Sequence, residues 1–145
     1  MDKDIALSDE KRIEKDGESL IIGALRKQGL WAMHVDCNID GFPDIMAVGQ
    51  QVVLVEMKYA RGNPRLQELM QPTQPVFMRS VEQAGYDDCL LCVYDGETFD
   101  LYDTHGIITA QLADARVQDL KGIVKHRTPE GIASIVATIA EDPYV

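Results

Sequence analysis

A short apolar run at residues 52–55 (VVLV) ends directly in Glu56, Met57 and Lys58. The run is β-branched and has no helical period, which predicts a strand buried on both faces, a position that ordinarily excludes charged side chains. Glu56 and Lys58 are two residues apart, so their side chains point to the same face of that strand. The sequence therefore predicts a buried strand that ends with a carboxylate beside an ammonium group.

Asp44 brings a second carboxylate to the same place. It opens another short apolar stretch (IMAV at residues 45–48), and the loop between the two runs has hairpin length. If Val48 lies opposite Val52 in an antiparallel pair, Asp44 lies opposite Glu56. Burying such groups costs several kcal/mol per charge unless something compensates them, and a divalent cation is suited to that role.

Two segments, GFPD at residues 41–44 and VEMK at residues 55–58, carry a resemblance to a known family. They contain a PD pair and an ExK triplet, which resemble the motif of the PD-(D/E)xK nuclease superfamily. Gln74, followed by Gly85, narrows the resemblance to the VRR-NUC (virus-type replication-repair nuclease) family. The resemblance covers about residues 14 to 103 of the chain.

The chemistry of phosphodiester hydrolysis gives these residues roles. A carboxylate-held Mg²⁺ or Mn²⁺ orients the attacking water and polarises the phosphate oxygens. Asp44 and Glu56 are the predicted metal ligands, together with the backbone carbonyl of Met57. Lys58 would hold the water or neutralise developing charge. The alternative is that Asp44 is an ordinary turn carboxylate and that Glu56 and Lys58 form a weak, solvated ion pair.

Two further site residues rest on the family resemblance. Glu18 would complete the first metal site or help to form a second, and Glu14 competes with it for that role. Gln74 would point its side-chain amide at the same cleft from the start of a helix, and Gln71 is its rival. Without the resemblance, Glu18 is more simply a surface acid in the first turn of a helix, where the helix dipole favours it.

The loop that follows the charged strand offers contacts for a nucleic acid. Arg61 and Arg65 lie on this loop and can reach the phosphates that flank the cleaved bond. Tyr59 precedes them and can stack on an unpaired base, although a tyrosine at a strand end more often serves packing.

The predicted fold is a single α/β domain over residues 1–145, with a restriction-endonuclease-like mixed sheet of about five strands flanked by helices. The expected order is α-β-β-β-α-β-β, with two extra helices in a C-terminal extension over residues 106–145. Residues 1–8 are expected to be loose. The predicted helices span Ser8 or Asp9 to about Gln28, Thr73 to Gly85, 114–125 and 129–141, and the predicted strands span 31–35, 44–48, 52–59, 89–94 and 98–102.

The charge balance restricts the kind of partner. The chain has 14 basic and 24 acidic residues and a formal net charge of −10, the wrong sign for gripping long DNA by bulk attraction. A nuclease could use a local basic patch and bound metal, and select DNA by shape. Alternatively, a non-catalytic acidic protein could mimic DNA or bind a basic partner, but that function leaves the charges at Asp44, Glu56 and Lys58 unexplained.

We therefore expect an Mg²⁺- or Mn²⁺-dependent DNA endonuclease that acts on branched DNA, similar to a Holliday-junction resolvase. The family resemblance also implies a homodimer. An apolar stripe in the last predicted helix (Ile132, Ile135, Val136 and Ile139) could meet a second subunit or simply cover the sheet. Three cysteines without a disulfide framework, no signal peptide and no membrane-length apolar run predict a cytoplasmic protein, in a bacterial or phage-infected cell.

Overall fold

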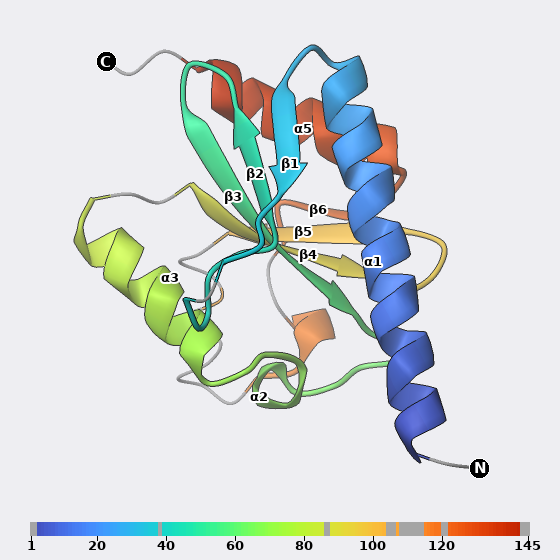
Figure 1. Ribbon diagram of the computed structural model, residues 1–145. Helices are drawn as coiled ribbons and strands as arrows, with labels where there is room; N and C mark the ends of the chain where they lie inside the picture. Colours follow the sequence, from blue (N-terminus) through green and yellow to red (C-terminus); the bar gives the residue numbers. More distant parts are fainter. Residues whose placement is uncertain are drawn as a thin grey trace.

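The computed structural model describes residues 3–37, 39–85, 88–103, 107, 115–119 and 122–142, with side chains from residue 9 onward. Its centre is a six-stranded mixed sheet in the order β1-β2-β3-β4-β5-β6 (Figure 1). The strands are β1 (Trp31–His34), β2 (Ile45–Val48), β3 (Val52–Tyr59), β4 (Cys89–Tyr94), β5 (Phe99–Asp103) and β6 (Val124–Arg127). The helices are α1 (Lys3–Lys27), α2 (Leu66–Leu69), α3 (Thr73–Gln83) and α5 (Pro129–Glu141), with a 3-10 turn, η1 (Val117–Asp119).

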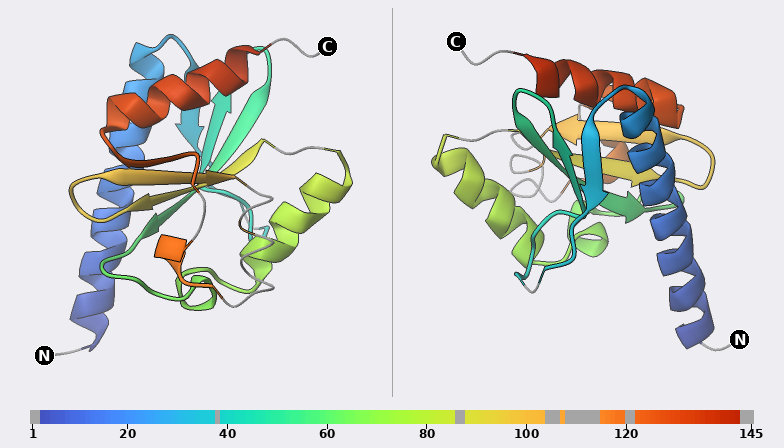
Figure 2. Two further views of the ribbon diagram at one scale, coloured as in Figure 1. Left: turned by 180° about the vertical axis from the view of Figure 1, so that it is seen from behind. Right: turned by 45° about the horizontal axis from the view of Figure 1, so that its top comes forward.

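Helices cover both faces of the sheet. α1 and α5 pack on one face, and α2 and α3 pack on the other (Figures 1 and 2). Successive side chains of β3 alternate between the two cores, so Val55 and Met57 face α1 and α5 while Leu54 and Glu56 face α2 and α3. Among the described strands, only β3 and β4 run parallel.

The predicted register between β2 and β3 is confirmed. Val48 lies opposite Val52, and the ladder continues to Ile45 opposite Val55. Asp44 falls just outside it, because β2 begins one residue later than predicted. β3 continues for four more residues, so the second half of its edge has no strand beside it on the β2 side.

Two details of the helices differ from prediction. α1 begins before the predicted cap at Ser8 or Asp9, because the preceding residues contain no glycine or proline to stop it. α3 is capped by Pro72 instead of Thr73, with no side-chain hydrogen bond at the cap. In α3, Met78 is buried, whereas Val76 is 64% exposed.

The predicted helix at 114–125 is wrong: its described parts form η1 and the beginning of β6, and positions 114, 120 and 121 lie outside the described residues. Ile123 donates its backbone N–H to the carbonyl of Leu101 at 2.7 Å, which attaches this segment to the sheet. The β-branched pair at 123–124 favours a strand over a helix. The sheet therefore has six strands where about five were predicted.

The helix predicted at 129–141 is confirmed as α5. Its apolar stripe faces the sheet and α1: Ile132 and Val136 are fully buried, and Ile135 and Ile139 pack against the same core. The stripe thus covers the sheet within one chain, while Ile135 and Ile139 stay half-buried, and the homodimer stays a prediction. No helix in the described part of the chain is long and apolar enough to cross a membrane.

α1 passes so close to the sheet that any side chain at position 17 would force a neighbouring ring to shift. A methyl group at Gly17 would lie 2.8 Å from Cδ2 of Tyr94, whose ring stacks on Phe99 with centroids 4.3 Å apart. At Gly23, on the same helix, an added methyl group meets no atom within 4 Å. α1 runs unbroken through Gly17, and the glycine serves packing.

We predict that Gly17→Ala lowers the free energy of unfolding by about 1–3 kcal/mol, because the ring of Tyr94 cannot yield. Gly23→Ala should raise it by about 0.5–1 kcal/mol through helix propensity alone. Urea unfolding of the two variants measures both values. Equal stabilisation by both substitutions would contradict the close packing of α1 on β4.

Candidate active site

Carboxylates replace the missing strand along the free edge of β3. Asp44 Oδ2 accepts the backbone N–H of Met57 at 2.9 Å, and Glu14 Oε2 accepts that of Tyr59 at 3.3 Å. Buried backbone N–H groups are costly to leave unpaired, so these contacts hold Asp44 and α1 against the strand. The N–H and C=O of one strand residue point to the same edge, so we infer that the Met57 carbonyl faces the Asp44 side as well.

Glu56 is the most deeply buried charged residue of the described chain, at 2% exposure. Its Oε1 accepts a hydrogen bond from Gln74 Nε2 at 2.8 Å and lies 3.7 Å from Lys58 Nζ. Its Oε2 is buried and has no hydrogen-bond donor among the described residues. The neighbouring carboxylate of Asp44 cannot donate when it is ionised, but a proton on one of the two acids or a cation between them would give Oε2 a partner.

Gln74, and not Gln71, reaches Glu56. Its side chain is buried, and its Oε1 accepts the backbone N–H of Gln71 at 2.8 Å, which fixes the direction of the amide. The loop before Asp44 reaches the same place: Gly41 has φ +83° and lies so close to the backbone of Thr73 that a side chain would not fit. A left-handed glycine therefore holds the GFPD segment against the start of α3.

Negative charge is in surplus at this site. Burial and, next, the charge of Asp44 raise the pKa of Glu56 well above its usual range, and Lys58 offsets only part of this rise. Burial followed by the charges of Asp44 and Glu14 raises the pKa of Glu18 to about 7. Burial also raises the pKa of Glu14, against the opposing effect of Lys58. Three lysines oppose this charge in part: Lys58 acts on Glu56 and Glu14, and Lys11 and Lys15 act on Glu14 and Glu18 respectively.

Glu18 and Asp44 line one cavity of about 470 Å³, together with His34, which the sequence analysis did not select. His34 Nδ1 lies 3.6 Å from Glu18 Oε2. No motif marks a histidine at a strand end, and only the pairing of β1 with β2 brings it beside Asp44. Both candidate acids of α1 therefore approach the site, because Glu14 and Glu18 are four residues apart on one helix face.

The donor set fits a divalent cation that prefers oxygen ligands. Across the described ranges, no three His, Cys, Asp or Glu side chains are gathered closely enough to hold a metal ion as they stand. The buried, unpaired Oε2 of Glu56 and the neighbouring Asp44 nevertheless supply the kind of oxygens that Mg²⁺ and Mn²⁺ bind. A cation would also relieve the repulsion between the two acids.

The predicted nucleic-acid residues lie next to this site. Tyr59 and Arg61 line a pocket of about 250 Å³ beyond the end of β3, and Arg65 is exposed at the start of α2. Their loop is firmly held: Asn63 accepts hydrogen bonds from Arg116 and from the backbone of Gln118, at 2.8 and 2.9 Å. The structure therefore presents these side chains on a supported loop.

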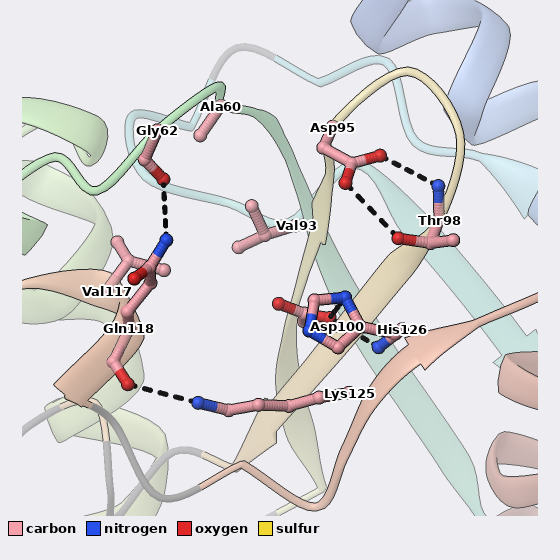
Figure 3. Close-up of a pocket in the computed structure, with 10 residues that line it drawn as sticks. All are labelled: Ala60, Gly62, Val93, Asp95, Thr98, Asp100, Val117, Gln118, Lys125 and His126. Carbon is pink, nitrogen blue, oxygen red and sulfur yellow. Dashed lines mark hydrogen bonds and ion pairs between the residues drawn. The ribbon is translucent and has the colours of Figure 1, made fainter.

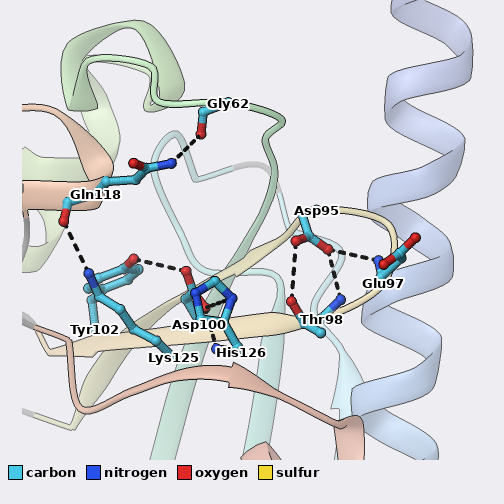
Figure 4. Close-up of polar contacts among 9 residues, drawn as sticks. All are labelled: Gly62, Asp95, Glu97, Thr98, Asp100, Tyr102, Gln118, Lys125 and His126. Carbon is cyan, nitrogen blue, oxygen red and sulfur yellow. Dashed lines mark hydrogen bonds and ion pairs between the residues drawn. The ribbon is translucent and has the colours of Figure 1, made fainter.

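A second pocket, of about 390 Å³, opens where the parallel strands β3 and β4 end (Figure 3). Asp100 and His126 dominate one side of it. His126 has a left-handed φ of +55° at an irregularity between β5 and β6, and its backbone N–H donates to Asp100 Oδ1 at 2.7 Å. Lys125 donates to the carbonyl of Gln118 at 3.1 Å (Figure 4). These polar groups satisfy one another and stabilise the bulge in the sheet.

Stability should depend on pH through Glu56. The pKa of Glu56 in the folded protein lies above the ordinary 4.5. Its full contribution to the stability of the metal-free protein is therefore present below pH 4.5, and this contribution is lost as the pH rises and the buried carboxyl group ionises. Glu56→Gln should therefore raise the free energy of unfolding at pH 8 by about 1–3 kcal/mol and flatten the pH dependence. Urea unfolding in the presence of a chelator measures this, with exposed Glu97→Gln as the control. A wild-type protein that becomes more stable from pH 5 to 8, with no gain from Glu56→Gln, would contradict the assignment.

The sequence has also been compared with models of protein families and with curated proteins. No family model matches it, and no curated protein does. The family resemblance of the segments at 41–44 and 55–58 therefore stays a prediction.

Proposed function

We propose that the protein is an Mg²⁺- or Mn²⁺-dependent DNA endonuclease that hydrolyses phosphodiester bonds. One observation carries the proposal: Glu56 is buried at the end of a central strand, beside Asp44, with Lys58 and Gln74 both at its Oε1. A charged side chain that serves only solubility would lie on the surface, where it stays in water and there is no free-energy cost of burying it. A cluster with one unpaired buried oxygen and excess negative charge has the chemistry of a cation site.

Each residue has a role that its contacts support. Asp44, Glu56 and the carbonyl of Met57 would hold the cation, which would polarise the phosphate and orient water. The side chain of Lys58 is 12% exposed and lies near the C-terminal end of β3. From there its ammonium group can stabilise negative charge on the phosphate. Gln74 orients the Glu56 carboxylate through its hydrogen bond. Glu18 would add a ligand from the α1 side.

The substrate we propose is branched or junction-containing DNA. The net charge of −10 opposes binding along an ordinary duplex, so recognition must come from a few local contacts and from shape. Arg61 and Arg65 would bind phosphates beside the cut, and Tyr59 would stack on a base that the branch leaves unpaired. A homodimer, which would place two such sites on one junction, belongs to the same proposal.

A second candidate function follows from the net charge. A non-catalytic acidic protein with this fold could bind a basic partner or mimic DNA, and then Glu56 would be a retained remnant. Such a protein should bind no divalent cation at the site. A titration with Mn²⁺ separates the two functions before any substrate is known.

We predict that Asp44→Asn and Glu56→Ala each reduce metal-dependent cleavage at least about a hundredfold, because both remove a ligand oxygen. Linear, flap and four-way DNA, incubated with and without Mg²⁺ or Mn²⁺, provide the assay. Circular dichroism checks folding, and Glu97→Gln is the matched surface control. Cleavage by either site variant at near the wild-type rate would rule out the proposed site.

Lys58→Ala should lower the turnover rate much more than it weakens metal binding, because its contact with the phosphate strengthens in the transition state. Cleavage rates at saturating Mn²⁺ and calorimetric Mn²⁺ affinities test the two effects separately. Unchanged turnover combined with weaker metal binding would instead make Lys58 a counter-ion of Glu56.

A further inference from the structure

His34 is fixed beside the proposed cation site by the backbone. It lies opposite Ile45 in the β1–β2 ladder, and the next residue, Val35, donates its N–H to the carbonyl of Asp44 at 2.8 Å. This hydrogen bond attaches the end of β1 to Asp44, which is the first of the predicted metal ligands. The position of the imidazole therefore follows from the sheet and not from a flexible loop.

The imidazole and two carboxylates face one cavity. Glu18, His34 and Asp44 all line the space of about 470 Å³ between α1 and the ends of β1 and β2. The distance from His34 Nδ1 to Glu18 Oε2 is 3.6 Å. Two ligands of one ion, each about 2.1 Å from it and at right angles, lie about 3 Å apart, so a small closure would let both groups bind the same ion.

A plain ion pair explains these contacts less well. The side chain of His34 is 52% exposed, and an ion pair with one exposed partner contributes only about 0–1 kcal/mol. It would also leave much of the negative charge in place: Lys15 lines the same cavity, but it offsets only part of the effect of burial, Asp44 and Glu14 on the Glu18 pKa. A divalent cation bound by the imidazole and the carboxylates relieves that repulsion.

We propose that His34 is a metal ligand which, with Glu18 and Asp44, holds a divalent cation on the α1 side of the site and makes this position prefer Mn²⁺ to Mg²⁺. The preference follows from the donor atoms: imidazole nitrogen suits first-row transition ions, whereas Mg²⁺ takes oxygen ligands and water. The inference deepens the proposed nuclease function and rests on it. It assigns a ligand and a cation preference that the PD and ExK residues alone do not supply.

Pulsed electron paramagnetic resonance of the Mn²⁺-loaded protein tests this directly, because a coordinated imidazole nitrogen modulates the electron spin echo. The wild-type protein should show this nitrogen modulation, and His34→Gln should abolish it. His126→Gln is the matched control, since His126 is also exposed and also lies beside an aspartate, at 3.9 Å from Asp100. Calorimetry should show that His34→Gln weakens Mn²⁺ binding about tenfold or more and changes Mg²⁺ binding less than about twofold.

Two results would overturn the inference, and they differ in what else they affect. Mn²⁺ that binds, depends on Glu56 and shows no nitrogen modulation would make His34 an ion-pair partner only, and the proposed nuclease site would stand. Wild-type protein that binds neither cation would remove this inference and the proposed function together.

Discussion

The hydrogen bond from the Met57 amide to the Asp44 carboxylate is the contact on which the site depends. The ladder between β2 and β3 stops where Ile45, the first residue of β2, lies opposite Val55, while β3 runs on to Tyr59, so the rest of the β3 edge needs acceptors from elsewhere. Asp44 supplies one and Glu14 of α1 supplies another. A difference in length between two neighbouring strands thus concentrates carboxylates at one point of a buried sheet.

That arrangement opposes stability, and the cation that we propose would relieve the same repulsion. Glu56 lies among apolar side chains such as Leu54 and Leu91, with one oxygen unpaired among the described residues. Close acids repel one another, and burial strengthens the repulsion because water no longer screens it. Sites that sacrifice stability in this way are commonly functional, and the contacts of Lys58 and Gln74 show how the remaining oxygen is held.

Local patterns were enough to predict the elements that build the site. The apolar run that ends in charged residues located β3, and the helical periodicity at 129–141 located α5. In an antiparallel pair, each step forward on one strand is a step backward on the other, so placing Val48 opposite Val52 was enough to give the register of β2 and β3. The failures occurred where tertiary contacts outweigh local patterns. Residues 123–124 were predicted as part of a helix because their apolar side chains fit the helical spacing of the preceding residues. Their pairing with Leu101 instead makes them part of the sheet edge. The place of His34 beside Asp44 could not be predicted, because it depends on the pairing of β1 with β2 and no local sequence pattern indicates it.

The central claim is that Asp44 and Glu56 form a cation site in which a buried proton is replaced by a metal ion. Calorimetric titration of Mn²⁺ into the wild-type protein at pH 7, in two buffers of different ionisation enthalpy, measures the protons released on binding. We expect saturable binding with release of about one proton per ion, because burial and the charge of Asp44 raise the pKa of Glu56 and favour a protonated carboxyl group, from which a bound metal displaces the proton. Absence of binding, or binding whose heat is the same in both buffers, would contradict it.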